Sequence, residues 1–494
     1  MSNKLKTIIS IVLSGAMLFS SSMTVSVNAV DTKEVLSDNE LNDYIEEYID
    51  TEKTPGLALT VVNENDVSFK NWGFDNISDQ IPTTETTHFE LASVSKAFTA
   101  LSVLLLQEEG KLSINDSVSD YLPWFNVKWN GENYDLKIWH LLNHTSGIPE
   151  EKTFSKIKSG TDDKLKEETA RLAVNLNLNF EPGTDFEYCN LGYDILAYLT
   201  EIVAEKPFEE YVTTEIFQPI GMNDSGYDIP TAQGYQKCFG QIIEYNAPRF
   251  KGSQGDGYVI TTTSDMSLWI KAQLGNMELP EKLKNAIEKS HHIYEDNQYI
   301  KCGEMEDGTE RFYANGWIMS EDKGLLTHSG GNPNFTTMLF VDYDRNIGVF
   351  AASNIQATTP LMAADCVYDM MSGKELIRKS VITDPTDIIA STVAIAFLIL
   401  LIVILILTIT QKKRLSKKSV SARKEKVKLT IKLIIFTLLL AVMISLPYLV
   451  GYNYMMAAVW MPYSVLTALI IVDIDLIMLI ISSIRRYIVM SQNK

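Results

Sequence analysis

Cysteine is scarce in this chain of 494 residues. Only Cys189, Cys238, Cys302 and Cys366 are present, and no two of them form a CxxC pair. A disulfide framework needs several closely spaced cysteines and a zinc site needs paired ligands, so neither is implied. We therefore expect a fold held together by a hydrophobic core, with no metal and no other cofactor.

Positive charge is also scarce through most of the chain. The formal net charge is −19, although residues 388–494 hold 13 Lys and Arg against 3 Asp and Glu, and residues 1–29 add two lysines. The segment 30–387 therefore carries a net charge of −31. Binding to nucleic acid rewards Lys and Arg that neutralise phosphates, so this acidic segment argues against such a partner.

The N-terminus has the pattern of an exported protein. Two lysines precede an apolar run from Thr7 to Phe19, and small residues lead up to Ala29. This pattern predicts a signal peptide at residues 1–29 with cleavage after Ala29. No cysteine lies near the cleavage site, so a lipid-anchored N-terminus is not expected.

Long apolar runs are confined to the C-terminal part of the chain. Three of them are long enough to span a bilayer, and they predict membrane helices at 388–410, 431–450 and 463–484. The loop 411–430 carries nine Lys and Arg, and three more lie in the tail 485–494. The positive-inside rule places both basic segments in the cytoplasm. The sequence therefore predicts a multi-pass protein of the cell membrane whose large N-terminal part is extracytoplasmic.

The segment between the signal peptide and the first span predicts an α+β fold. Sheet-forming patterns lie at both ends of an α-rich stretch, which gives two lobes with a cleft between them. The expected elements are an acidic helix at 38–51, hairpin strands at 57–62 and 67–72, helices near 164–176, 190–204 and 207–215, strands at 313–319, 325–328, 335–341 and 347–352, and a closing helix at 358–373.

A serine and a lysine begin the most apolar helical run of this segment. From Val94 to Leu106 nearly every side chain is apolar or small, so the helix must be buried, and Ser93 and Lys96 share one face of its first turn. Burial disfavours the charged amine and is expected to lower the pKa of Lys96, making it a base for a Ser93 nucleophile. The alternative is a helix cap with one snorkelling lysine.

Two further motifs follow at a distance. Tyr188 and Asn190 stand two apart before a predicted helix, and the run His328-Ser329-Gly330-Gly331 ends a predicted strand. A strand of small residues can lie close to a substrate and offer a backbone N–H to an oxyanion. Either motif alone also has an ordinary explanation, because the Tyr-x-Asn spacing recurs at Tyr313 and a histidine often ends a strand.

Together and in this order, the three motifs resemble those of the serine β-lactamase and penicillin-binding-protein superfamily, in its class C-like branch (peptidase family S12). The resemblance runs through nearly all of residues 38–372 and includes the segments Tyr121–Pro123, Leu141–Pro149, Pro219–Met222 and Thr262–Met266. It implies a β-lactamase/DD-peptidase-like domain at residues 30–380, with an antiparallel sheet flanked by helices and an α-rich lobe.

The resemblance also implies roles for the motif residues. Ser93 is then the nucleophile, Lys96 its base partner and Tyr188 a proton shuttle. The substrate contacts are implied for Asn190, which binds the substrate amide, for the strand His328-Ser329-Gly330, and for the N–H groups of Ser93 and Gly331 as the oxyanion hole. His144 and Thr145 are expected to shape a supporting loop.

Two features bear on the substrate, which is expected to be a small molecule or a peptide with an acyl group. Relatives that read a substrate carboxylate often have Lys where His328 stands, and histidine is mostly neutral at pH 7. No Lys or Arg lies between Arg345 and Lys374. Both features favour a serine peptidase or esterase that acts on an uncharged acyl group.

The sequence leaves several alternative functions open. The layout also resembles membrane peptidases that remove an N-acyl-D-asparagine cap from colibactin- and zwittermicin-type prodrugs. A D-Ala-D-Ala carboxypeptidase or β-lactamase is a further alternative. A penicillin-binding sensor would be the non-enzymatic one, although no sizeable cytoplasmic domain is present to transmit a signal. Homo-oligomerisation is left open, as is the role of Asp473 and Asp475 in the third span.

Overall fold

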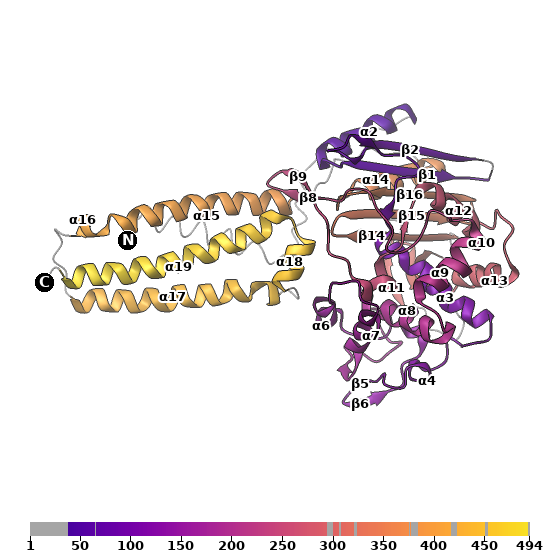
Figure 1. Ribbon diagram of the computed structural model, residues 1–494, viewed down its shortest axis with the longest axis horizontal. Coiled ribbons are helices and arrows are strands. Elements are labelled where there is room, and N and C mark those ends of the chain that lie inside the picture. The colour runs from indigo at the N-terminus through magenta and orange to yellow at the C-terminus, as the bar shows by residue number, and fades with distance from the viewer. Residues whose placement is uncertain are drawn as a thin grey trace.

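The chain divides into a head domain and a bundle of C-terminal helices, which lie end to end (Figure 1). The bundle is called the anchor after the membrane spans that the sequence predicts in it. The computed structural model describes residues 38–64, 66–293, 300–305, 308–320, 324–374, 376, 384–415, 422–449 and 453–492. The head domain comprises the described residues up to 376, and the anchor those from 384 onward. The predicted signal peptide lies outside the described residues.

One antiparallel sheet forms the centre of the head domain. Its strand order is β11-β12-β13-β14-β15-β16-β1-β2-β3. Leu57 of β1 pairs with Ser353 of β16, so the two sheet-forming ends of the domain, which the sequence predicts, meet in mid-sheet. The strands are β1 (Gly56–Val62), β2 (Val67–Asn76), β3 (Ile81–Pro82), β11 (Lys301–Glu304), β12 (Glu310–Ala314), β13 (Trp317–Ser320), β14 (Leu325–Asn332), β15 (Phe335–Asp342) and β16 (Ile347–Ser353).

The prediction of a single strand at 313–319 is wrong. The run is split between β12 and β13 by Asn315 and Gly316, whose φ angles are +55° and +83°. Positive φ at two central residues makes the tight hairpin turn that Asn-Gly favours. A side chain at Gly316 would come within 2.5 Å of the Ala97 nitrogen, so the turn packs directly on the helix that follows Ser93.

Helices cover both faces of the sheet and form two hydrophobic cores. On one face, Leu41 and Tyr44 pack with Leu57 and Val367. On the other face, Phe98 stacks on Trp269 at 3.9 Å between ring centroids. Helices α2 (Asp38–Glu52) and α14 (Thr359–Met371) supply the first layer, and α3 (Lys96–Glu108), α12 (Thr263–Gln273) and α13 (Glu281–Ser290) belong to the second. The predicted first and last helices of the domain are thereby confirmed.

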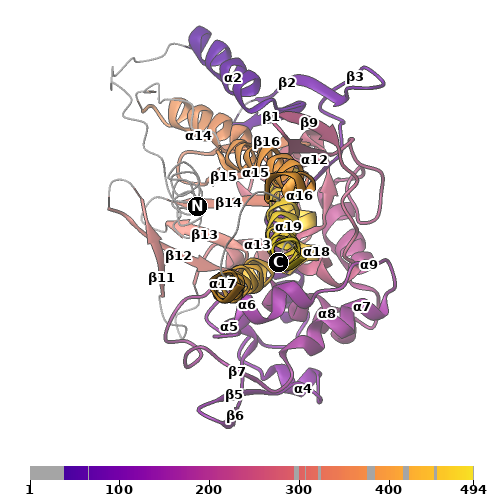
Figure 2. The same cartoon turned by 90° about the vertical axis from the view of Figure 1, so that its left-hand side faces the viewer.

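The inserted stretch forms an α-rich lobe beside the sheet (Figure 2). Its longest helix, α8 (Asn190–Ala204), has the predicted bounds, whereas the helix expected over 164–176 ends at Ala170 and continues only as a short 3-10 turn. The other elements of the lobe and its borders are α4 (Val118–Tyr121), α5 (Ile138–Leu142), α6 (Glu150–Thr153), α7 (Lys164–Ala170), α9 (Phe208–Val212), α10 (Gln218–Ile220), α11 (Gln254–Gly257), and the short strands β4 (Phe89–Glu90), β5 (Val127–Trp129), β6 (Glu132–Tyr134), β7 (Leu176–Asn177), β8 (Tyr235–Cys238), β9 (Gln241–Glu244) and β10 (Ile260–Thr261).

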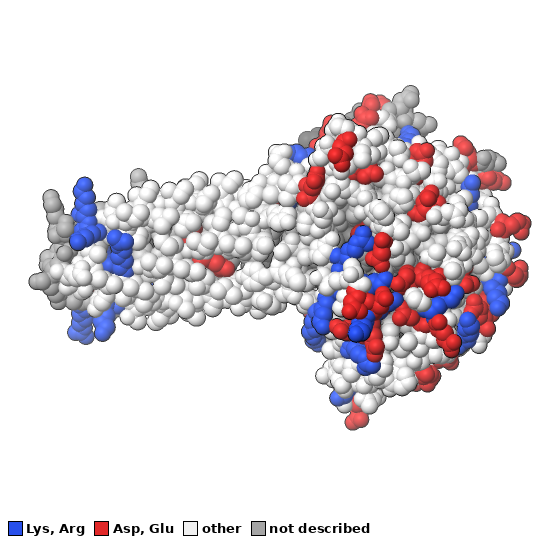
Figure 3. Space-filling model, in the orientation of Figure 1, with Lys and Arg blue, Asp and Glu red and all other residues white. Residues whose placement is uncertain are grey.

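The anchor consists of three helices that are long and apolar enough to cross a membrane. They are α15 (Thr386–Ile409), α17 (Ala422–Leu449) and α19 (Tyr463–Gln492), with α19 between the other two (Figure 2). Short helices α16 (Gln411–Leu415) and α18 (Tyr454–Trp460) lie at opposite ends of the bundle. Figure 3 shows Lys and Arg at the free end of the anchor and a nearly uncharged flank. Inside the bundle, the Asp475 side chain is buried.

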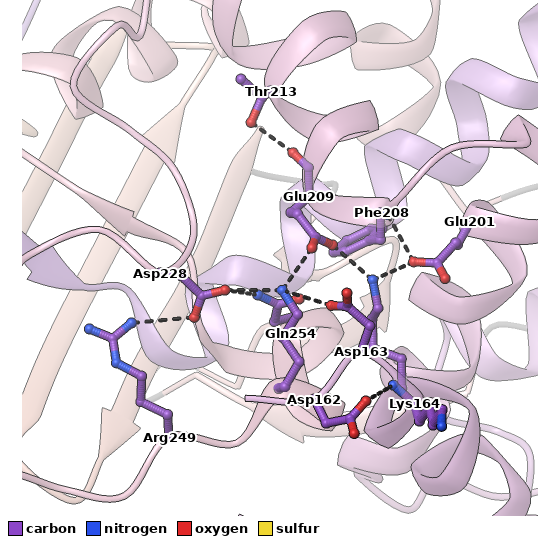
Figure 4. Close-up of polar contacts among 12 residues, drawn as sticks. Asp162, Asp163, Lys164, Glu201, Phe208, Glu209, Thr213, Asp228, Arg249 and Gln254 are labelled. Carbon is purple, nitrogen blue, oxygen red and sulfur yellow. Dashed lines mark hydrogen bonds and ion pairs between the residues drawn. The ribbon is translucent and has the colours of Figure 1, made fainter. Parts of the chain in front are cut away.

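An ion-pair network stiffens the α-rich lobe (Figure 4). Glu209 of α9 accepts hydrogen bonds from Lys251 at 2.7 Å and from Lys166 at 2.9 Å, and both lysine side chains are buried. Lys166 also contacts Glu201 of α8, and Lys251 contacts Asp228 at 3.0 Å. Burial removes water from these charged groups. The stability of each buried charge therefore depends on the opposite charges beside it in the network.

Glu209→Gln is expected to lower the free energy of unfolding by about 1.5–3 kcal/mol at neutral pH, because it removes hydrogen bonds between charged groups. Burial alone would raise the pKa of the Glu209 carboxyl, but the bonds from Lys251 and Lys166 lower it to about 2 from 4.5. The carboxylate therefore stabilises the fold above about pH 4.5, and this contribution is lost as the pH falls towards 2.

The measurement is denaturant unfolding of the purified full-length protein at several pH values. The stabilities of wild type and Glu209→Gln should converge as the pH falls through this window. Glu210→Gln is the matched control, because Glu210 is exposed on the same helix. An equal loss in both variants would contradict the role given to the network.

Candidate active site

Ser93 lies on a 3-10 turn, Ala92–Ser95, that leads into α3. The turn begins in an unusual backbone conformation, since Ala92 has a φ of +49°. It is held from behind by Ser95, whose Oγ accepts a hydrogen bond from the Val259 nitrogen at 3.1 Å. Positive φ in a residue with a side chain costs energy and is often found where a functional group must be aimed. The Ser93 side chain is thus presented at the edge of a rigid, buried helix.

Lys96 connects two of the three predicted motifs. Its side chain is fully buried. The Nζ atom lies 3.2 Å from Ser93 Oγ and donates to Asn190 Oδ1 at 2.7 Å and to the Asp256 carbonyl at 2.8 Å. A carboxylate oxygen of Asp256 is 3.9 Å away. The amine is therefore fixed between the serine of the first motif and the asparagine of the second.

The expected direction of the Lys96 pKa is wrong. Burial does lower the pKa, as the sequence argument assumed, but negative charge on Tyr188 and Asp256 outweighs it, and the net pKa is raised. Burial was the only effect that the local sequence indicated, because Asp256, the acid that faces Lys96, lies on α11, far away in the sequence. Lys96 is therefore expected to rest as an ammonium group.

Tyr188 completes the group around Ser93. Its ring centroid lies 4.9 Å from Lys96 Nζ and 4.2 Å from the centroid of His144. Burial raises the pKa of the Tyr188 hydroxyl, while the charge of Lys96 and hydrogen bonds with Lys96 and Ser93 act in the opposite direction. His144 is buried and accepts a hydrogen bond from the Cys189 nitrogen at 3.1 Å, so it shapes the loop that carries Tyr188.

Strand β14 passes close to the nucleophile, and its residues alternate between two sides. Ser329 and Gly331 are exposed, whereas His328 and Gly330 are buried. A side chain at Gly330 would come within 2.2 Å of the Leu91 carbonyl, so only glycine allows the strand to lie this near the turn of Ser93.

The ring of His328 lies behind strand β14. Its Nδ1 lies 2.6 Å from the Ser329 carbonyl and its Nε2 lies 3.0 Å from Tyr313 Oη, which engages both ring nitrogens behind the strand. Burial and the positive charge of Lys96 lower the His328 pKa to about 3, so the ring is neutral at pH 7 as expected. The side chain faces the interior, and the exposed residues beside it are Ser329 and Gly331.

Sequence reasoning missed Glu150. Its Oε1 accepts a hydrogen bond from Asn190 Nδ2 at 2.8 Å and its Oε2 accepts one from the Asn190 nitrogen at 3.1 Å. Because Glu150 holds the Nδ2 side of the Asn190 side-chain amide, the carbonyl oxygen of that amide is turned towards Lys96. Glu150 begins α6, and no spacing in the sequence relates it to Asn190; only the fold brings the two together.

A cavity of about 100 Å³ adjoins Ser93, and its walls come from both the head domain and the anchor. Asp256 is the one acid among the lining residues, which include no Lys or Arg. The lining residues are Ser93, Phe154, Ile157, Asn190, Phe250, Ser253, Asp256, Gly257, Tyr258, Gly331, Asn332, Met456 and Trp460. The first, second and third predicted motifs thus meet at one cavity through Ser93, Asn190 and Gly331.

This two-lobed α+β domain, with a serine and a buried lysine at the cleft, has the arrangement of serine hydrolases of the penicillin-binding type. A family model described as Beta-lactamase matches residues 41–368, and the chain belongs to this family. At the level of the family, this membership supports a serine hydrolase.

Similar proteins agree with this assignment. Protein flp of Staphylococcus aureus (strain COL) is 28% identical over 328 residues, which cover 65% of this chain and 64% of that protein. Penicillin-binding protein 4* of Bacillus subtilis (strain 168) is 26% identical over 336 residues, covering 62% of this chain and 69% of that protein. The match thus spans about 64% of the length of the staphylococcal relative.

Solved structures share the fold. The octameric penicillin-binding protein homologue from Pyrococcus abyssi has a TM-score of 0.58 and 25% identity, covering 73% of this chain and 81% of that chain. The D-alanine carboxypeptidase AmpC from Burkholderia cenocepacia has a TM-score of 0.54 and 21% identity, covering 68% of this chain and 100% of that chain. The predicted β-lactamase-like α+β fold is confirmed.

Proposed function

We propose that this protein is a membrane-anchored, extracytoplasmic serine hydrolase, a peptidase or esterase, that acts through an acyl-enzyme on Ser93. The observation that carries the proposal is the position of Lys96 Nζ, 3.2 Å from Ser93 Oγ and 2.7 Å from Asn190 Oδ1. A serine hydroxyl is a weak nucleophile until a neighbouring group takes its proton. Here Lys96 and Tyr188 together supply that group.

In the proposed first step, Ser93 Oγ attacks the substrate carbonyl carbon and its proton passes to the Lys96–Tyr188 pair. The pair is competent when it has lost one proton. Because the Lys96 pKa is raised, the ammonium remains and stabilises a Tyr188 oxygen that accepts the proton. That proton then goes to the leaving group as the bond between the carbonyl carbon and the leaving group breaks.

In the second step, water attacks the acyl-enzyme carbonyl and gives a proton to the same pair. The bond to Ser93 Oγ breaks, Ser93 regains a proton and the acid product leaves. In both steps the carbonyl oxygen becomes an anion, for which we propose the N–H groups of Ser93 and Gly331 as donors. We propose that Asn190, which Glu150 holds and which accepts a hydrogen bond from Lys96, also contacts the substrate amide.

The lining of the cavity favours an uncharged acyl substrate. Its residues include no Lys or Arg, and Asp256 would repel a substrate carboxylate. His328 is not among the lining residues, and its buried ring is neutral at pH 7, so it supplies no cation to the cavity. A charge-assisted hydrogen bond is worth about 1.5–3 kcal/mol, and a site without the cation does not gain it.

We expect matched substrate pairs, a free acid against its amide, to show no preference for the free acid in kcat/KM. The full-length protein in detergent should be assayed with acyl-peptides of both kinds and with penicillins and cephalosporins, which should be poor substrates. A preference for the free acid of about tenfold or more would contradict this proposal.

That outcome would favour the second candidate, a carboxypeptidase or β-lactamase. This candidate is supported by the names of two similar proteins, the penicillin-binding protein 4* of Bacillus subtilis and the D-alanine carboxypeptidase of Burkholderia cenocepacia. A prodrug-activating N-acyl-D-amino-acid peptidase is compatible with the first candidate, and chirality of the residue on the acyl side would distinguish it from a simple esterase.

The proposed topology places the head domain outside the cell. The basic segments 411–430 and 485–494 should lie in the cytoplasm, because Lys and Arg are retained on that side. Protease treatment of intact cells should digest exposed loops of the head domain and spare both basic segments. Digestion of the 411–430 loop with protection of the head domain would overturn this orientation.

A further inference from the structure

The loop between the second and third membrane helices is part of the active-site cavity. This loop contains α18, and its residues Met456 and Trp460 line the same cavity as Ser93. Figure 1 places α18 where the anchor meets the head domain. From the order of the membrane spans, only a short external connection is expected here. The contact between α18 and the active-site cavity is therefore seen only in the folded structure.

Polar contacts fix α18 to the head domain. Gln236 Nε2 donates to the carbonyl of Met461 at 2.9 Å, and Tyr245 Oη donates to the carbonyl of Val459 at 3.2 Å. At the other end, Asn453 Nδ2 donates to the Ser155 carbonyl at 2.8 Å. The head domain therefore holds the loop through backbone carbonyls at one end and through the Asn453 side-chain amide at the other.

Hydrogen bonds also hold the start of the anchor, at α15, to the head domain. Asp387, buried at the beginning of α15, accepts hydrogen bonds from the backbone nitrogens of Phe239 and Gly240 at 3.1 and 2.6 Å. It also accepts one from Ser464 Oγ of α19 at 2.6 Å. These bonds join two membrane helices to the β8–β9 turn, so the anchor holds α18 at a set position over the cavity.

The wall that α18 provides is apolar. Trp460 packs on Phe154 with 5.4 Å between ring centroids, and Val459 packs with Ile157 and Phe250 in one hydrophobic cluster. Met456 is almost completely buried. The same cavity is lined by Ser93, Asn190 and Gly331, where a substrate carbonyl would be attacked.

We propose that α18 is a specificity element, which selects substrates with an apolar group on the acyl side of the scissile bond. The acyl part stays bonded to Ser93 through both steps, so a wall beside Ser93 contacts it throughout. An apolar cavity of about 150 Å³ holds one benzene molecule. The cavity of about 100 Å³ therefore suits a short alkyl or small branched group. This inference rests on the proposed hydrolase function.

The test measures kcat/KM of the full-length protein in lipid nanodiscs for p-nitrophenyl acetate, butyrate and hexanoate. Each buried methylene is expected to raise kcat/KM about fourfold, which corresponds to about 0.8 kcal/mol. Met456→Ala and Trp460→Ala should reduce the gain to less than about twofold per methylene, because the wall is then removed. The readout is the dependence on chain length and not the absolute rate.

The matched control is Met455→Ala. Met455 is on the same helix but is 47% exposed, so the variant should keep the wild-type chain-length dependence. Unchanged dependence in both Met456→Ala and Trp460→Ala would overturn the inference, as would equal loss in Met455→Ala. A dependence that appears only when the alcohol side is lengthened would also overturn it. Absence of turnover and of Ser93 labelling in the wild type would instead contradict the proposed function itself.

Discussion

Ser93→Ala is expected to lower substrate turnover by about 10⁴- to 10⁶-fold and to abolish covalent labelling by a fluorophosphonate probe. The reason is that the variant lacks the oxygen that forms the acyl-enzyme. Labelling can be followed on gels of the full-length protein in detergent, and turnover with p-nitrophenyl acetate.

Ser102→Ala is the matched control for this prediction. Ser102 lies on α3, the helix that follows Ser93, and its hydroxyl donates to the Phe98 carbonyl at 2.8 Å, away from the cavity. This variant should label and turn over like the wild type. Persistent labelling of Ser93→Ala would move the nucleophile elsewhere in the chain.

The second large effect is expected for the proton-transfer pair. Tyr188→Phe and Lys96→Met should each lower kcat/KM by about 10²- to 10⁴-fold, which is the usual contribution of general acid–base catalysis. The double variant should be little worse than either single one, because residues that act as a unit have non-additive effects. Strict additivity, or near-normal acylation in either variant, would contradict the proposed pair.

The pH dependence follows from the same pair. The reactive state has one proton fewer than the resting state, and the pKa values of both Lys96 and Tyr188 are raised. The wild-type kcat/KM should therefore increase with pH through the neutral range, with an apparent pKa that belongs to the pair. This rise should disappear in Tyr188→Phe. A rate that falls as the pH rises through neutrality would contradict the assignment.

Much of the head domain could be predicted because its patterns are local. The run from Val94 to Leu106 had to be buried, since apolar side chains cover all of its faces. Two strand-like runs, 57–62 and 67–72, joined by a short polar connection, predicted the first hairpin. The small residues around Gly330 predicted a strand that can lie close to a substrate. Each of these inferences needs only neighbouring residues.

The failures concern contacts between distant segments. The pKa of Lys96 depends on Asp256, and the orientation of Asn190 depends on Glu150. No spacing in the sequence relates either acid to its partner. Nor does any local pattern indicate that Tyr313, from a neighbouring part of the sheet, holds the His328 ring inside.

The anchor shows the same limit. The composition of this segment predicts three membrane spans, because the length and apolarity of a span are properties of neighbouring residues. The positions of Lys and Arg predict the orientation of the spans. Neither predicts that Met456 and Trp460 of the intervening loop lie against the cavity, since that depends on how the anchor docks on the head domain. The site therefore draws on a part of the chain that its sequence marks only as a connection.

The central claim, an acyl-enzyme on Ser93, is tested most directly by trapping that intermediate. The full-length protein is mixed with an ester substrate, quenched in acid within the first turnovers, digested and mapped by mass spectrometry. The account predicts an added acyl mass on the peptide that contains Ser93 and its absence after complete hydrolysis. An acyl group mapped to another residue, or substrate consumption by an enzyme that never carries one, would contradict it.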